Sequence, residues 1–153
     1  MIDNTTLVKI LNSRLACSPA LAWLKQRNSD EMWTQCERPN WLLWWVAPYV
    51  PRTELVRVVC QCARLALPHV AAGELRPLTA IETAEAWVRG EATMEEVKSA
   101  AEAADAAAAE AAYARADDRA VHASDAAGSD AQAQMCELIR EQWPTCPEPG
   151  VQG

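Results

Sequence analysis

The 153-residue sequence contains no phenylalanine and only five glycines, two tyrosines and two histidines. So few glycines, with no Asn-Gly or Asp-Gly turn between alternating apolar segments, argue against a β-sandwich or β-barrel. The longest apolar run, Trp41 to Pro48, is far shorter than the roughly 20 residues needed to span a bilayer. The N-terminal residues show no cationic run followed by an apolar stretch. We therefore predict an all-helical, cytoplasmic protein without a membrane anchor.

Catalytic motifs are also missing. The sequence has no Gly-x-Ser-x-Gly, no phosphate-binding glycine-rich loop, no His-Glu-x-x-His and no Gly-x-Gly-x-x-Gly. The closest pair of its six cysteines, Cys60 and Cys62, would point to nearly opposite sides of a helix, which does not suit a zinc site. In a cytosolic protein we expect these cysteines to be reduced, buried thiols. We predict a protein that is not an enzyme and holds no metal and no cofactor.

The charge is divided unequally along the chain. The formal net charge of −7 is the sum of +3 on residues 1–81 and −10 on residues 82–153. Non-specific nucleic-acid binding requires a basic surface, and the sequence contains no cluster of Lys and Arg residues. We exclude non-specific nucleic-acid binding and expect an acidic surface on the C-terminal part, with room for a basic pocket in the first half.

Apolar residues make up 50% of the chain, and five of the seven tryptophans lie within the first 45 residues. Among them, Trp41, Trp44 and Trp45 occupy a short helix that is apolar on every side, so we interpret them as core rather than as a stacking surface. We predict one helical domain over residues 1–143 and a Pro-rich flexible tail over 144–153. Capping residues, proline and glycine divide the domain into about seven or eight helices, over residues 6–16, 18–26, 29–36, 41–47, 52–67, 78–89, 94–124 and 130–142.

One predicted helix is unusually rich in alanine. Residues 100–133 include 18 alanines, and Thr93 with Glu96 forms a capping box before them, so we predict a long helix from Met94 to about Ser124. Gly128 and Ser129 then separate it from the last helix. An apolar, Ala-lined face permits close helix packing, and we expect it to drive homo-oligomer formation. Its members are Met94, Val97, Ala101, Ala104, Ala108 and Ala111.

Two groups of polar residues are candidate binding sites. Arg57, Arg64, Arg76 and Arg89 lie on two neighbouring predicted helices and the loop between them, where convergent guanidinium groups can clamp phosphates or carboxylates. Their alternative role is surface pairing with glutamates such as Glu54, Glu82 and Glu85. The second group interrupts the Ala-lined face, either as a site for a ligand or a partner subunit or as a solvated helix end; it comprises Arg115, Asp118, Arg119 and His122.

Three stretches resemble the immunity-five-like family of immunity proteins from bacteria and phages. They are WTQCERPNWLLWWVA at Trp33, ARLALPHV at Ala63, and RPLTAIETAEAWVRGEAT at Arg76, followed by the alanine repeats. The resemblance extends from about Leu21 to Tyr113. It implies a small cytosolic protein that neutralises a toxin or a defence activity by binding it, and it assigns no functional residues.

Two functions are therefore open. The first is a non-enzymatic inhibitor whose acidic face binds and neutralises a toxin or an immune-defence effector. The alternative is a phage-encoded, oligomeric sponge that sequesters a nucleotide immune signal, a small anionic ligand, in an arginine-lined pocket between subunits. An arginine pocket built by two chains would favour the sponge, and an uninterrupted acidic surface would favour the inhibitor.

Overall fold

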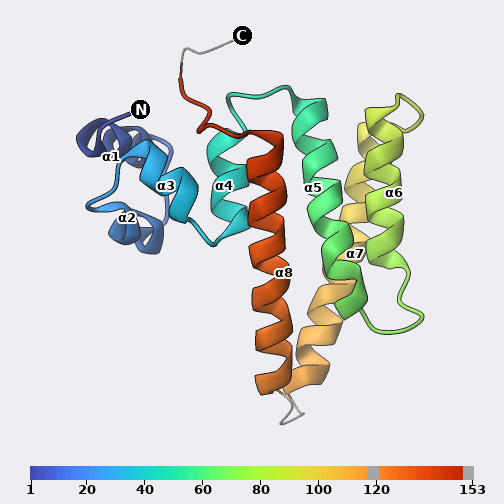
Figure 1. The fold of residues 1–153 in the computed structure, drawn as a ribbon. Helices are drawn as coiled ribbons and strands as arrows, with labels where there is room; N and C mark the ends of the chain where they lie inside the picture. Colours follow the sequence, from blue (N-terminus) through green and yellow to red (C-terminus); the bar gives the residue numbers. More distant parts are fainter. Residues whose placement is uncertain (117–120, 150–153) are drawn as a thin grey trace.

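The computed structural model describes residues 1–116 and 121–149, and within its last two helices it describes side chains only up to residue 110 and from residue 128. This part of the chain is all-helical and has no strand, which confirms the predicted fold class (Figure 1). Eight α helices and one short 3-10 turn follow one another as α1 Asn4–Ser13, α2 Ser18–Leu24, α3 Ser29–Gln35, α4 Pro39–Val46, α5 Arg52–Ala66, η1 Leu67–His69, α6 Arg76–Val88, α7 Met94–Ala116 and α8 Val121–Gln142.

Capping residues set several helix starts where the sequence predicts them. The Asn28 side chain accepts from the backbone N–H of Glu31, and the Glu31 carboxylate accepts in return from the N–H of Asn28. Thr93 and Glu96 form the same reciprocal pair at the start of α7. Each box satisfies two of the backbone donors that a helix start leaves unpaired, so both starts are fixed by local sequence.

The four longest helices, α5 to α8, lie side by side, and the short helices α1 to α4 gather on the other side of α8 (Figure 1). α8 packs against both α4 and α5. Its buried residues join a single core with Trp33 of α3 and Leu42 and Trp45 of α4, all at most 2% exposed. The C-terminal half of α8 therefore connects the tryptophan-rich N-terminal part to the rest of the molecule. No helix in the described ranges is long and apolar enough to cross a membrane.

The boundary between the last two helices differs from the prediction. α7 ends at Ala116 rather than near Ser124, and α8 begins at Val121 and runs through Gly128 and Ser129, where the sequence predicts a break. The two helices run in opposite directions (Figure 1). A single helical glycine costs only about 1 kcal/mol relative to alanine. Packing of α8 along α4 and α5 offsets that cost, so the helix continues.

The predicted Ala-lined face of α7 is covered only in part, and the buried side of the helix is rotated from the predicted one. α6 packs along α7 more extensively than any other pair of helices. Ala107 is buried, at 5% exposed, although it is not a member of the predicted face. Of the predicted face, Met94, Val97 and Ala104 are half-buried, whereas Ala101 and Ala108 are exposed. The small alanine side chains permit close approach of α6, and homo-oligomer formation through the remaining exposed alanines stays a prediction.

The Pro-rich segment predicted as a flexible tail is held against the N-terminal helices as far as Glu148. The indole N–H of Trp45 donates to the carbonyl of Pro147 at 2.9 Å. The buried hydroxyl of Ser29 donates to the Glu148 carboxylate at 2.8 Å, and the N-terminal ammonium lies 3.0 Å from the same carboxylate. Burial alone would raise the pKa of Glu148, but the bonds from Ser29 and the ammonium lower it below the ordinary value. The prediction missed these contacts because their partners are more than 100 residues away.

Candidate functional site

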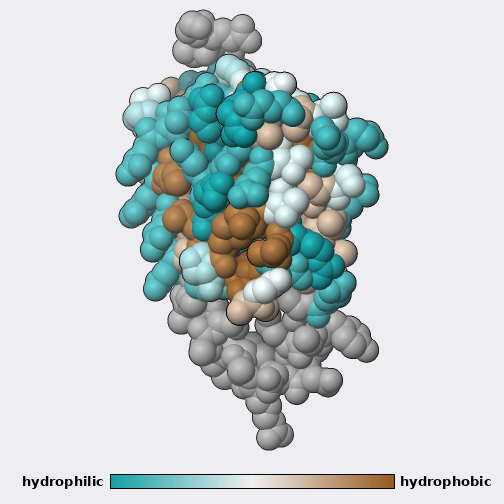
Figure 2. Space-filling model, turned by 90° about the vertical axis from the view of Figure 1, so that its right-hand side faces the viewer, coloured by the Kyte–Doolittle hydropathy of each residue, from teal (hydrophilic) through white to brown (hydrophobic). Residues whose placement is uncertain are grey.

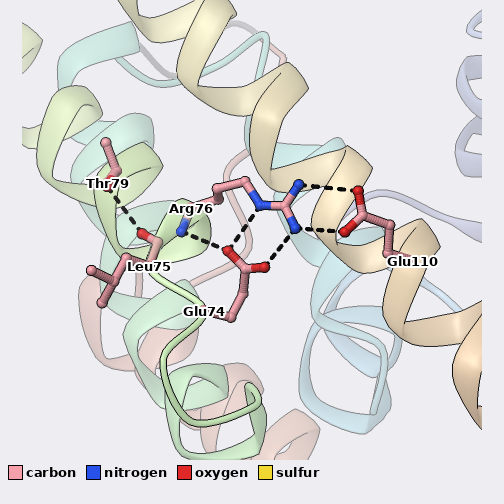
Figure 3. Close-up of polar contacts among 5 residues, drawn as sticks. All are labelled: Glu74, Leu75, Arg76, Thr79 and Glu110. Atoms are coloured by element: carbon pink, nitrogen blue, oxygen red, sulfur yellow. Dashed lines mark hydrogen bonds and ion pairs between the residues drawn. The ribbon is translucent and has the colours of Figure 1, made fainter.

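Arg76 is the centre of the most extensive ion-pair cluster in the described residues (Figure 3). It precedes Pro77 at the first turn of α6, and its guanidinium lies between two carboxylates. The Glu74 carboxylate accepts from Nε at 2.9 Å and Nη2 at 2.6 Å. The Glu110 carboxylate of α7 accepts from Nη1 at 3.2 Å and Nη2 at 2.7 Å. Two bidentate partners use the donors with which a phosphate clamp would bind its ligand.

The electrostatics of this cluster follow from the same bonds. Side-chain hydrogen bonds from Arg76 lower the pKa of Glu74 to about 2, and they also lower the pKa of Glu110. The bonds from Glu74 and then Glu110 raise the pKa of Arg76. Two carboxylates and one guanidinium leave the cluster with one net negative charge. Its chemistry suits a clasp between α6 and α7 better than an anion site.

Two further candidate arginines are paired elsewhere. Arg64 of α5 donates to both oxygens of Glu85 of α6, at 2.8 and 2.7 Å, and these bonds lower the pKa of Glu85. Arg89 pairs with Glu91 at 2.7 Å. Glu85 and Arg89 are four residues apart on α6, a spacing that favours an ion pair, but Glu85 instead makes the bidentate contact with Arg64 across two helices. The suggested alternative, pairing of Arg64 with a surface glutamate, is the observed one.

The four arginines of the first group do not share one pocket. Arg76 and Arg89 stand at opposite ends of α6, about 20 Å apart at the helical rise of about 1.5 Å per residue. Arg57 is exposed on α5 and makes no hydrogen bond or ion pair to any residue that the structure describes. The structure therefore shows two separate pairs, the three-residue Arg76 cluster and one exposed arginine.

The second candidate group falls almost wholly outside the described residues. Asp118 and Arg119 lie between α7 and α8, outside the described ranges. Arg115 belongs to the last turn of α7 and His122 to the first turn of α8, and their side chains are likewise outside what the structure describes. Their binding role stays a prediction.

A groove of about 1160 Å³ lies among α7, α8, the start of α4 and the α5–α6 connection. Small residues of both helices line it, including Ala107, Gly128 and Ala131. Glu74 and Glu110 of the Arg76 cluster lie on its wall, together with His69 from the α5–α6 connection. The sequence suggested the alanine lining but not the groove, because the groove is lined by segments that are far apart in the sequence.

The solvent face of α7 is acidic. Over Glu95 to Glu110 it carries five carboxylates and one lysine, all exposed. On the side of the molecule where α6 and α7 lie, Figure 2 shows an apolar patch framed by hydrophilic residues. Leu75, which precedes α6, is 65% exposed. An apolar centre with a polar rim is the usual anatomy of a protein interface.

A second cavity, of about 440 Å³, lies among α1 to α4 and was not predicted. Four tryptophans line it: Trp23, Trp41, Trp44 and Trp45. The prediction that α4 is buried on every side is wrong for Trp44, which is 38% exposed, while Trp45 is 1% exposed. Helix periodicity could not reveal this, because α1 and α2 leave one side of the short helix uncovered.

The cysteines show no site for chemistry. Each of the six is a free thiol, and four of them are buried. Burial raises the pKa of Cys62 and Cys136 to about 11 and that of Cys146 to about 12, so these thiols resist ionisation. Among the described residues, no group of three or more His, Cys, Asp or Glu side chains is placed to hold a metal ion.

Comparison with known proteins gave one family. A family model described as "Imm-5 like putative immunity protein" matches residues 49–134, more than half of the chain. No curated protein and no solved structure matched. The matched residues include α5 to α7 and the first part of α8. Of the stretches that carry the resemblance in the sequence, the one from Trp33 to Ala47 lies before the matched range.

Proposed function

Since the chain belongs to the Imm-5 like family of immunity proteins, we propose that it is a non-enzymatic inhibitor that binds and neutralises a toxin or an immune-defence effector. The observation that carries the proposal is the exposed face of α7, which lies within the family-matched residues. Glu95, Glu102 and Asp105 on this face form no ion pair with any described residue. They are free to meet cationic side chains of a partner.

Two features of this surface support a protein partner. Charged residues at a rim steer association and fix orientation, and carboxylates suit a basic effector. The apolar patch in Figure 2 lies on the same side of the molecule. It offers the apolar contact area that the centre of a protein interface needs and that charged rim residues do not supply. α7 is also held firmly by α6 and by the Arg76 clasp, so the acidic face is presented on a rigid element.

The test is binding to, and inhibition of, toxins and defence effectors encoded next to the gene. We expect the double variant Glu102→Lys, Asp105→Lys to reduce the association rate by at least about tenfold at low salt. The matched control, Glu137→Lys with Glu141→Lys, reverses two exposed carboxylates on α8 and should leave binding unchanged. Equal losses in both variants, or no binding to any neighbouring effector at micromolar concentration, would count against the proposal.

The alternative, a sponge for a nucleotide signal, has weaker support from the arginines for which it was suggested. Arg64, Arg76 and Arg89 already bind glutamates. A sponge that used them would have to break those pairs or use the undescribed side chains of Arg115 and Arg119. Unchanged nucleotide affinity in an Arg64→Ala, Arg76→Ala variant would exclude a sponge that binds through these two arginines, and unchanged affinity in an Arg115→Ala, Arg119→Ala variant as well would exclude the sponge.

We also propose that the protein acts in the cytoplasm and self-associates. α6 already covers much of the Ala-lined face, so self-association would use the exposed Ala101 and Ala108 or the α7–α8 groove. Light scattering at high protein concentration tests it: a mass of 16.8 kDa contradicts self-association, and a multiple of that mass supports it.

A further inference from the structure

The cleft among α1 to α4 has the form of a small-molecule site. We call it the tryptophan cleft. Its floor is built from core residues that are at most 5% exposed, including Leu11, Met32 and Cys36. Its mouth is formed by the more exposed Leu15 and Trp44. A volume of about 440 Å³ falls within the usual range of ligand pockets, roughly 300 to 1,000 Å³.

The charge around the tryptophan cleft is one-sided. No carboxylate lines it, and its only lining side chains with polar groups other than the indoles are Asn40 and two cysteines. Three arginines lie over the rings of lining tryptophans, although none of the three is itself a lining residue of the cleft. The pairs, with the distance from the guanidinium carbon to the ring centroid, are Arg14 on Trp44 at 4.0 Å, Arg27 on Trp23 at 4.3 Å and Arg38 on Trp41 at 4.8 Å.

None of these three arginines is paired with a carboxylate in the described part of the chain. Arg14 donates to backbone carbonyls at the end of α4, and Arg27 donates to the carbonyl of Trp23 and to the amide of Gln35. Arg38 is exposed and donates no hydrogen bond to a described residue. Neutral acceptors leave the positive charges uncompensated, in contrast to the glutamate-paired arginines of α5 and α6.

The mouth also contains a strained residue. Leu15 has φ of +58° at the end of α1, a position where glycine is usual. The N–H of Ala16 closes this turn on the carbonyl of Leu11 at 3.0 Å. A leucine here costs backbone strain and leaves its side chain 90% exposed, so it contributes little to the core. Strain and exposure together point to a role at the cleft mouth rather than in folding.

We propose that the tryptophan cleft binds a small organic anion: a flat aromatic or short acyl body with one carboxylate, sulfonate or phosphate group. The body replaces water against the indole faces, and the three guanidinium groups stabilise the negative charge through the field around the rings. A cationic ligand, the usual occupant of an aromatic cage, would face three like charges here. This binding site is independent of the acidic α7 face, and all of its lining residues precede the family-matched range.

The experiment is calorimetric titration of the full chain with probes that share one ring system and differ in charge. Naphthalene-2-sulfonate should bind one site with a Kd of about 100 µM or tighter, as expected for its size. The neutral 2-naphthylmethanol should bind more weakly, and 2-naphthylmethylammonium should not bind measurably. Octanoate tests an acyl anion. Tighter binding of either anion supports the proposal and identifies the aromatic or the acyl class of ligand.

Two variants place the binding in the cleft. Ala16→Phe fills the cleft and should abolish sulfonate binding, whereas Ala22→Phe, at an exposed position of α2 outside the lining, should not. Arg38→Gln removes an unpaired charge and should weaken binding about fivefold, with the exposed Arg52→Gln as its matched control. Circular dichroism checks that each variant is folded.

Three results would overturn the proposal. The first is failure of both anions to bind the wild-type chain. The second is binding of the naphthyl ammonium as tightly as the sulfonate. The third is unchanged sulfonate affinity in both Ala16→Phe and Arg38→Gln, which would locate the binding elsewhere. If Ala16→Phe fails to fold, the Arg38→Gln measurement decides alone.

Discussion

Ile139→Ala should destabilise the whole molecule, because Ile139 lies where α8 closes the core. Its side chain is fully buried and packs in the cluster with Leu42, Trp45 and Val58. Removing three buried carbons costs about 2.4 kcal/mol at about 0.8 kcal/mol each. A residual cavity of about 40 Å³ adds about 1 kcal/mol. We expect a loss of about 3 to 4 kcal/mol in the free energy of unfolding, and a Tm lower by about 10 °C for a chain of this size.

The assay is urea unfolding followed by tryptophan fluorescence and by far-UV circular dichroism. Fluorescence reports mainly on the tryptophans of α2 to α4, whereas dichroism reports on all helices. Because one core joins both parts, the two transitions should coincide and shift together. The matched control is Gln134→Ala, an exposed position on the same helix, which should change stability by less than about 0.5 kcal/mol. A loss below 1 kcal/mol for Ile139→Ala, or two separate transitions, would refute the idea of a shared core.

Three further predictions concern the clasp and the cleft mouth. Arg76→Ala should lower the Tm, since it frees Glu74 and Glu110 and separates α6 from α7, whereas Arg52→Ala should not; thermal unfolding of both decides. The bonds from Arg76 lower the pKa of Glu74 from 4.5 to about 2. The stabilisation that the ionised Glu74 contributes is therefore complete above pH 4.5 and is lost as the pH falls towards 2. Glu74→Gln should therefore flatten the loss of stability in this acid range, and an unchanged urea-midpoint profile would contradict the clasp. Leu15→Gly should raise the free energy of unfolding by about 0.5 to 1 kcal/mol through relief of strain while weakening naphthalene-2-sulfonate binding; a less stable variant would contradict the assigned strain.

Local signals in the sequence were sufficient for most helix positions. The capping box of Asn28 and Glu31 and that of Thr93 and Glu96 each depend on residues three apart, and Gly90 adopts the left-handed conformation expected after a helix. The all-helical fold and the family could be predicted for the same reason, since alanine repeats and short motifs are visible in one dimension.

The division of the Ala-rich segment into α7 and α8 could not be predicted. Residues 113–127 contain neither glycine nor proline, so no local signal ends a helix there, whereas Gly128 offers a misleading one. The choice depends on α8 packing against α4 and α5 through its buried residues, such as Cys136 and Ile139. Tertiary contact decided the boundary over local propensity.

The candidate sites were predicted by residue type but not by partner. Sequence spacing identifies Arg64 and Arg76 as surface residues, yet Glu85 reaches Arg64 from α6 and Glu110 reaches Arg76 from α7, and only Glu74 of Arg76 is a neighbour in the sequence. The tryptophan cleft was missed because its signal, an arginine over each of three rings, exists only after α1 to α4 have packed. The strain at Leu15 has a signal in the sequence, since a leucine follows the last turn of α1 at a position where a glycine is usual.

The position of the buried residues along α8 has a consequence for the design of protein fragments. The family-matched range stops at Gln134, whereas Cys136, Ile139 and Trp143, which are buried and close the core over α5, come after it. A fragment cut to residues 49–134 would leave the apolar side of α5 open to water. We therefore expect the segment that identifies the family not to fold alone, because its core contacts include residues from Met135 to Trp143 and, through them, the helices before it.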